Sequence, residues 1–194
     1  PGARCSNATG NGNETFLSGT GNHRKVLHVE VFMKTNAARM LEKAGIRFEL
    51  REYEVDESDL GGLHVAHSIG MPPERVFKTL VARGDRNGVL VACIPVDREL
   101  NLKALARESG NKKVDLVPLK EVQPLTGYIR GGVSPVGMKK RFPTFIDESA
   151  FEFDAISVSA GMRGSQMVVD PTGLERLTGA KRSAISRRDQ ASGE

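Results

Sequence analysis

The chain has 194 residues, of which 39% are hydrophobic and 27% are charged, and its formal net charge is +4. This length is enough for one domain with a buried core, and the longest apolar stretch, Val89 to Val96, is far too short to span a membrane. Aromatic residues make up only 5% of the chain and tryptophan is absent, which argues against a nucleic-acid surface built on stacked rings. The two cysteines, Cys5 and Cys93, show no disulfide or metal-ligand spacing, so we expect a reduced, cytoplasmic protein.

Residues 1–32 differ in composition from the rest of the chain. They are rich in Gly, Asn, Ser and Thr, show almost no apolar periodicity and lack the apolar core of a signal peptide. We therefore predict that 1–32 is a disordered or non-native extension, that 33–188 forms one domain, and that 189–194 is a flexible tail. Net charges of +1 in 1–32 and +2 in 181–194 leave only +1 for the body.

The body nevertheless holds two local basic clusters, Lys112-Lys113 and Lys139-Lys140-Arg141. Such clusters can hold phosphate groups through contacts that weaken as the salt concentration rises. The alternative is a solvated face, and for either cluster taken singly we slightly favour that alternative.

From residue 33 onward, helical and strand patterns alternate. Apolar spacing and capping residues predict short helices at 36–43 (capped by Thr35 or Asn36), 63–69 and 102–108, a helical turn at 119–122, and a last helix with Asp170 as its cap and Pro171 at its first position. Strand patterns cover 47–53, 76–82, 89–96, 114–117, 144–147, 155–159 and 166–169. A turn at 84–88 predicts a hairpin. We predict an α+β fold: a mixed, mostly antiparallel sheet or barrel with short helices packed around it.

Lys78 lies within an apolar run, Val76 to Ala82, that otherwise predicts a buried strand. An unpaired buried charge is costly, so a strand that places an ammonium at an apolar position usually uses it. Lys78 could hold a phosphate or a ribose hydroxyl, act with a lowered pKa, or extend from the end of the sheet to water. Periodicity alone does not decide among these roles.

A glycine-rich segment, Gly127 to Pro135, follows about fifty residues later. Its Gly131-Gly132 step either lets the backbone approach a ligand and direct N–H groups at it, or forms a strained turn or bulge. A second glycine-punctuated turn, Ser159 to Gly164, follows a predicted strand and could line a pocket or make a bulge. Together with Lys78, the Gly131-Gly132 step suggests a pocket for an anionic or carbonyl-bearing ligand.

Several familiar catalytic motifs are absent from the sequence, including the Gly-x-Ser-x-Gly elbow, the Walker A loop and the dinucleotide-binding fingerprint. His64 and His67 stand three apart on a predicted helix, but no carboxylate or cysteine has matching ligand spacing, so we favour a solvated helix face. Cys93 lies among valine and isoleucine in a predicted strand, which favours an inert core thiol. We expect no metal and no cofactor.

Three segments together carry a specific resemblance: Val76–Val81, Gly127–Arg141 and Val158–Gly164. In order and in content they resemble the YbaK/EbsC family, and the likeness extends over about residues 33–188. Members of this family are trans-editing aminoacyl-tRNA deacylases, related to the editing insertion domain of bacterial prolyl-tRNA synthetases. The Gly-Tyr-x-x-Gly-Gly-x-Ser-Pro form is closer to the Cys-tRNA(Pro) branch than to the Ala-tRNA(Pro) branch.

The resemblance implies an enzyme that removes cysteine from mischarged Cys-tRNA(Pro), with Cys-tRNA(Cys) as a further candidate substrate. It implies catalytic roles for Lys78, which would bind the terminal nucleotide or polarise the ester, and for Gly131, whose backbone would hold the carbonyl or the developing oxyanion. The positions that match the family's substrate pocket are Tyr53, Thr79, Gly132, Ser134, Ser159 and Gly161. The implied partners are the acceptor end of an aminoacyl-tRNA and prolyl-tRNA synthetase.

In the cysteine-specific branch the substrate thiol is expected to attack its own carbonyl, so that the protein mainly positions the ester. Two alternatives remain: an Ala-tRNA(Pro) deacylase, and a non-catalytic tRNA- or nucleotide-binding module of the same fold. The chain also departs from the family at two places. Leu60-Gly61-Gly62 stands where close relatives carry an aromatic residue, and Gln166 stands where some members carry an acid, so neither role carries over.

Overall fold

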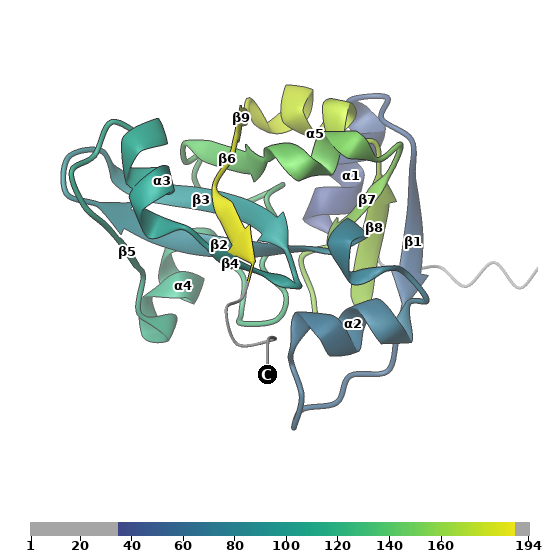
Figure 1. Cartoon of the computed structure of the whole chain (residues 1–194). Coiled ribbons are helices and arrows are strands. Elements are labelled where there is room, and N and C mark those ends of the chain that lie inside the picture. Colours follow the sequence, from purple (N-terminus) through teal and green to yellow (C-terminus); the bar gives the residue numbers. More distant parts are fainter. Residues whose placement is uncertain (1–34, 189–194) are drawn as a thin grey trace, which may run out of the picture. The chain divides into compact units, whose positions relative to one another are not determined.

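The computed structural model describes residues 35–188 (Figure 1). The predicted extension 1–32 and the predicted tail 189–194 lie outside the described residues, and so does Cys5. The helices are α1 (Asn36–Lys43), α2 (Gly62–Ser68), α3 (Leu102–Glu108), α4 (Leu119–Thr126), α5 (Pro171–Thr178) and the short 3-10 helices η1 (Pro73–Arg75) and η2 (Glu148–Glu152). The strands are β1 (Phe48–Glu52), β2 (Phe77–Gly84), β3 (Gly88–Pro95), β4 (Arg98–Leu100), β5 (Val114–Leu116), β6 (Thr144–Asp147), β7 (Ile156–Ser159), β8 (Ser165–Val169), β9 (Lys181–Ser183) and β10 (Ser186–Arg188).

The capping residues confirm both predicted helix starts. The Thr35 hydroxyl accepts a hydrogen bond from the N–H of Ala38 at the start of α1. The Asp170 carboxylate accepts from two N–H groups at the start of α5, where Pro171 occupies the first turn and has no N–H to satisfy. These caps satisfy backbone donors that would otherwise have no partner inside the helix.

Helix α4 is longer than the predicted turn at 119–122. Pro124 lies inside it and removes one backbone donor, but the last turn stays bonded. The Thr126 hydroxyl donates to the carbonyl of Val122 at 2.8 Å, and the N–H of Gly127 donates to the carbonyl of Gln123 at 2.8 Å. Gly127 has φ of +86°, a value that favours glycine and ends the helix.

The strands form open sheets. The predicted α+β fold with a mixed, mostly antiparallel sheet is therefore confirmed, and the barrel alternative is wrong for the described residues. One sheet has the order β5-β2-β3-β6-β9 and a second has the order β1-β8-β7, while β4 and β10 form a separate pair. The predicted hairpin is β2–β3, which is antiparallel and closes at Gly84 opposite Gly88. The pairs β3–β6 and β6–β9 are parallel, and the other strand pairs are antiparallel.

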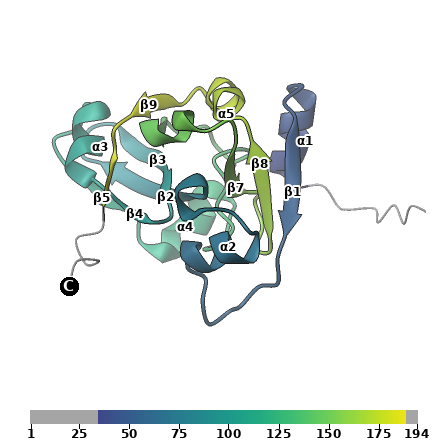
Figure 2. The ribbon, with the colours of Figure 1, turned by 45° about the vertical axis from the view of Figure 1, so that its right-hand side comes forward.

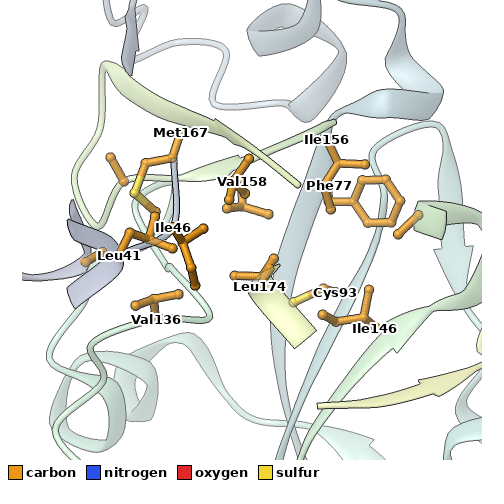
Figure 3. Packing of buried hydrophobic residues seen from close by; sticks show 14 of the residues in the cluster. Leu41, Ile46, Phe77, Cys93, Val136, Ile146, Ile156, Val158, Met167 and Leu174 are labelled. Atoms are coloured by element: carbon orange, nitrogen blue, oxygen red, sulfur yellow. The ribbon is translucent and has the colours of Figure 1, made fainter. Parts of the chain in front are cut away.

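The main core fills the space between the two larger sheets (Figure 3). Phe77 of β2 and Cys93 of β3 belong to the same cluster as Val158 of β7 and Met167 of β8, and the apolar faces of α1 and α5 also contribute to it. Helix α3 covers the opposite face of the five-stranded sheet through Leu105 and its neighbours. Figures 1 and 2 show β1, β8 and β7 side by side, away from the end of the domain that holds α3 and β5.

Two smaller apolar clusters anchor the remaining helices. Helix α2 packs through Ala66 against Val76 and Val96, next to the three-stranded sheet. Helix α4 packs through Val122 against Val81 of β2. Residues of both clusters line the cavity described below. No helix within residues 35–188 is long and apolar enough to cross a bilayer.

Candidate active site

A cavity of about 350 Å³ lies between α2 and α4, along the first half of β2. Strand β5 pairs with β2 only from Ala82 to Gly84, so the preceding residues of β2, which pair with β3 on their other edge, border the cavity on this edge. Most of the wall is apolar, and the polar side chains come from separate segments. The lining residues are Leu60, Gly62, Val65, Val76, Phe77, Lys78, Thr79, Leu80, Val81, Val96, Leu116, Val117, Leu119, Val122, Arg130, Gly131, Val133, Ser159 and Gln166.

Lys78 enters the wall from β2. Its backbone pairs with Ile94 of β3, and its half-buried side chain donates from Nζ to the carbonyl of Val96 at 3.2 Å. This contact holds the ammonium at the end of β3, beside the cavity. A lysine in this position can meet an anionic or electron-rich group of a ligand without leaving the sheet.

The glycine loop forms the facing wall through Gly131, which has φ of +83°. Arg163 fixes the loop from the β7–β8 turn, because its Nε donates to the carbonyl of Arg130 at 2.8 Å. The same guanidinium contacts both carboxylate oxygens of Glu57 at 2.7 and 2.8 Å. A chain of contacts from Glu57 through Arg163 therefore sets the position of the peptide that precedes Gly131.

Gly132 explains why the loop needs a second glycine. A Cβ atom built on it would lie 3.0 Å from the backbone carbon of Met162, closer than nearly all real Cβ contacts. The loop and the β7–β8 turn therefore lie backbone against backbone, and the N–H of Gly132 donates to the carbonyl of Ile129 at 3.0 Å. A side chain at residue 132 would require the loop or the β7–β8 turn to shift by a few tenths of an ångström.

Ser159 and Gln166 lie opposite each other on β7 and β8 and reach the same cavity. The Ser159 hydroxyl oxygen accepts a hydrogen bond from the N–H of Gly161 at 3.2 Å. Gln166 is held by Ser157, whose hydroxyl donates to its Oε1 at 3.2 Å. The described lining contains no histidine, cysteine or carboxylate, so none of these groups can activate Ser159 as a nucleophile.

The structure brings together Lys78, Thr79, Gly131 and Ser159 from the set proposed by resemblance, and all four line the cavity. The remaining members lie beside the cavity but do not line it. Tyr53 packs in the α2 cluster, Gly132 supports the loop, Ser134 is buried and accepts from the N–H of Val136, and Gly161 lies against the ring of Tyr128. The roles of all these residues in catalysis and substrate binding stay predictions.

Most of the apolar wall was not predicted from the sequence. Leu116 and Leu119 flank Val117-Pro118 and are 51% and 62% exposed, although large apolar side chains usually lie inside. The signal in the sequence was the spacing of apolar residues across a proline, which also fits an ordinary edge strand. Arg130 was also missed, because its place in the glycine loop gave no sign that it borders the cavity.

The Leu60-Gly61-Gly62 departure now has a structural account. Leu60 and Gly62 line the cavity, and a Cβ on Gly62 would lie 2.4 Å from the Val96 side chain. The start of α2 thus lies directly on Val96, and backbone atoms form this part of the wall.

Cys93 is fully buried in the main core, as predicted, and burial raises the pKa of its thiol to about 12. A thiol with this pKa carries almost no thiolate at neutral pH, and Cys93 does not line the cavity. It therefore has neither the ionisation nor the access that a nucleophile needs.

Comparison with known proteins identifies the class. Residues 63–177 match the family model described as the aminoacyl-tRNA editing domain. The chain is 46% identical to EbsC of Enterococcus faecalis, a proposed Cys-tRNA(Pro)/Cys-tRNA(Cys) deacylase, over 80% of this chain and 95% of that protein. The chain therefore belongs to the aminoacyl-tRNA editing domain family, and the predicted membership is confirmed.

Two further comparisons agree with this assignment. A multifunctional Ser/Thr-tRNA deacylase, ProXp-y of Escherichia coli strain K12, is 30% identical over 52% of this chain and 62% of that protein. A crystal structure described as a proposed trans-editing enzyme for prolyl-tRNA synthetase superposes with a TM-score of 0.69 at 24% identity, covering 78% of this chain and 95% of that one. At this level of identity the structural likeness supports the fold alone.

Proposed function

We propose that this protein is a trans-editing aminoacyl-tRNA deacylase that removes cysteine from mischarged Cys-tRNA(Pro), with Cys-tRNA(Cys) as a second candidate substrate. The observation that carries the proposal is the meeting of Lys78, Gly131 and Ser159 around one largely apolar cavity whose described lining contains no histidine, cysteine or carboxylate. Such a wall can bind and orient an ester, and the substrate or water can then supply the attacking group.

In the proposed reaction the protein binds and orients the ester, and the substrate supplies the attacking thiol. The thiol sulfur of the bound cysteine forms a bond to its own carbonyl carbon, which generates a tetrahedral oxyanion beside the backbone of Gly131. Collapse of this intermediate breaks the bond to the ribose oxygen. The thiol proton ends on that oxygen, so the products are tRNA with a free terminal hydroxyl and a four-membered cysteine thiolactone that water later opens. Lys78 holds the terminal nucleotide or the ester oxygen and stabilises the negative charge that develops there.

The partners follow from the substrate. The acceptor end of an aminoacyl-tRNA is the ligand, and prolyl-tRNA synthetase is the source of the mischarged molecule and a candidate binding partner. This work belongs in the cytoplasm, where charged tRNA is made and used.

The test is deacylation of Cys-tRNA(Pro), Ala-tRNA(Pro), Ser-tRNA(Pro) and Pro-tRNA(Pro) by the purified chain. We expect selective loss of cysteine from tRNA(Pro). Preferential removal of alanine or serine would support the deacylase activity but overturn the proposed specificity for cysteine. An absence of turnover on all four substrates would overturn the enzyme and favour a non-catalytic tRNA-binding module.

A second experiment separates cyclisation from direct attack by water. Methylation of the substrate sulfur, in S-methylcysteinyl-tRNA(Pro), removes the internal nucleophile but keeps an ester and a side chain of similar shape. We expect this substrate to resist deacylation while it competes with Cys-tRNA(Pro) for binding. Turnover close to that of Cys-tRNA(Pro) would mean that water attacks directly.

A further inference from the structure

A second cavity, of about 180 Å³, lies at the far end of the glycine loop. Lys139, Lys140 and Arg141 contribute to its wall, together with the hydroxyl-bearing residues Thr144 and Thr178. Its other described lining residues are apolar or glycine, and none of the described lining residues is acidic. The wall therefore combines three positive charges with hydroxyl groups, a combination suited to an oxygen-rich anion.

The three cations are exposed and form no ion pair with another described residue. The other basic cluster differs in this respect, because Lys113 contacts the carboxylate of Asp115 at 2.9 Å. An exposed run of like charge repels itself, so an approaching anion gains from each of the three cations. The 139–141 cluster is thus the stronger candidate for a phosphate contact.

The backbone that carries the cluster is held in place from several sides. The hydroxyl of Tyr128 donates to the carbonyl of Val136 at 2.7 Å, and burial raises the pKa of Tyr128, so the hydroxyl stays protonated at neutral pH. The Asn36 amide donates to the carbonyl of Gly137 at 3.1 Å. The N–H of Lys139 donates to the carbonyl of Thr126 at 3.0 Å. A fixed backbone presents the cations without the entropy cost of ordering a loose loop.

One loop serves both cavities. Gly131 lines the cavity that holds Lys78, and residues 135–142 line the second cavity. The eight steps along the chain from Gly131 to Lys139 span at most about 29 Å when fully extended. That bound corresponds to fewer than ten nucleotide steps of about 3.4 Å along one strand of a helix. A nucleic acid whose end lies at Gly131 can therefore reach the basic cluster with its phosphates.

We infer that Lys139, Lys140 and Arg141 bind the phosphate backbone of the tRNA acceptor arm while the aminoacyl end occupies the cavity beside Lys78. The identity of the nucleic acid rests on the proposed function; the charge and the geometry of the cluster do not. The contact is independent of sequence, because phosphates carry no base information. It supplies affinity and fixes the direction in which the strand leaves the active site.

The test compares two double variants that remove the same charge. Lys140→Ala with Arg141→Ala removes two cations of the cluster, and Lys112→Ala with Lys113→Ala is the matched control. Binding of an uncharged tRNA(Pro) acceptor minihelix is measured by fluorescence anisotropy over a range of salt concentrations. We expect the first double variant to bind the minihelix at least about tenfold more weakly than the parent. The slope of log K against log salt should become shallower by about 2. The affinity of the control should stay within about twofold of that of the parent.

Activity on a truncated substrate separates a tRNA contact from damage to the active site. The first double variant should lose kcat/KM on the cysteinylated minihelix but not on cysteinyl-adenosine, which has no acceptor arm. Equal losses on both substrates, or equal binding losses in the two double variants, would overturn the inference. If the parent binds the minihelix through the cluster but deacylates no substrate, the inferred phosphate site is supported and the proposed deacylase activity is overturned.

Discussion

Two charged side chains inside this fold, Asp147 and Lys78, have opposite surroundings. Asp147 ends β6, is only 2% exposed, and accepts hydrogen bonds from the N–H and the hydroxyl of Ser149 and from the N–H groups of Ile185 and Ser186. Lys78 lies beside a cavity of about 350 Å³ that can admit a ligand. The chain itself surrounds the carboxylate, whereas it leaves space next to the ammonium. We therefore expect Asp147 to serve stability and Lys78 to serve catalysis.

The largest expected effect comes from replacing Lys78. Lys78→Ala should lower kcat/KM for Cys-tRNA(Pro) about 100- to 1000-fold, which is the size expected when a donor to developing charge is lost. The melting temperature should change little, because the side chain is only half-buried and borders a cavity. The measurement is single-turnover deacylation beside thermal unfolding. If Lys78→Ala lowers the melting temperature but the remaining folded molecules keep full activity, Lys78 serves stability and not catalysis.

The next effect is on stability, at Asp147. Asp147→Ala removes the acceptor of several buried donors, so the free energy of unfolding should fall by about 2–4 kcal/mol. For a domain of this size the melting temperature should fall by roughly 5–15 °C. Ser149→Ala is the matched control, because it removes one partner and keeps the carboxylate, and its cost should be smaller. Denaturant titration measures both, and an unchanged midpoint for Asp147→Ala contradicts the assignment.

A smaller effect should follow from changing Arg163, which acts through the loop and is therefore a positioning residue. Arg163→Gln loses the contacts with Glu57 and weakens the hold on the Arg130 carbonyl, so kcat should fall about tenfold with little change in KM. Arg163→Lys keeps a cation and one donor and should recover part of the loss. If Arg163→Gln changes only KM, Arg163 contacts the substrate and does not position Gly131.

The smallest expected effect is at Cys93. Its thiol pKa of about 12 means that less than about one molecule in a thousand is ionised at pH 8, so in a Cys5→Ser background a disulfide reagent should react only after unfolding. The raised pKa also sets a pH dependence. The folded state holds the thiol proton more tightly than the unfolded state, so this contribution is intact below about pH 8.5 and is lost as the pH rises toward 12. Fast labelling of the native protein at pH 8 would show that the core opens readily.

How far the sequence predicts this molecule depends on the kind of pattern. Apolar periodicity and caps located the long elements, from the helix at 36–43 to the β2–β3 hairpin, because burial and capping act within a few residues. The three-residue strands β4, β9 and β10 were not predicted, because they are polar and form by pairing with strands that are distant in sequence. The closure into a barrel was wrong for a related reason: no local signal states where a sheet ends.

The candidate site divides in the same way. Lys78 and the glycine loop stood out because each breaks a local rule, a charge in an apolar strand and a step of two glycines. Leu116 and Arg163 did not stand out, because an apolar strand residue and an arginine in a turn are common. Their importance comes from what lies across from them in space, a cavity in one case and the Arg130 carbonyl in the other.

The parallel pairing of β9 with β6 has a consequence for how the protein folds during synthesis. Residues 181–183 complete the five-stranded sheet, and the N–H groups of Ile185 and Ser186 complete the shell around Asp147. A nascent chain that has exposed only its first 178 residues already holds every residue of the Lys78 cavity but lacks this closing strand. The domain therefore reaches its full cooperativity only after residues 181–186 leave the ribosome, and a chain truncated after residue 178 should form the cavity wall with lower stability.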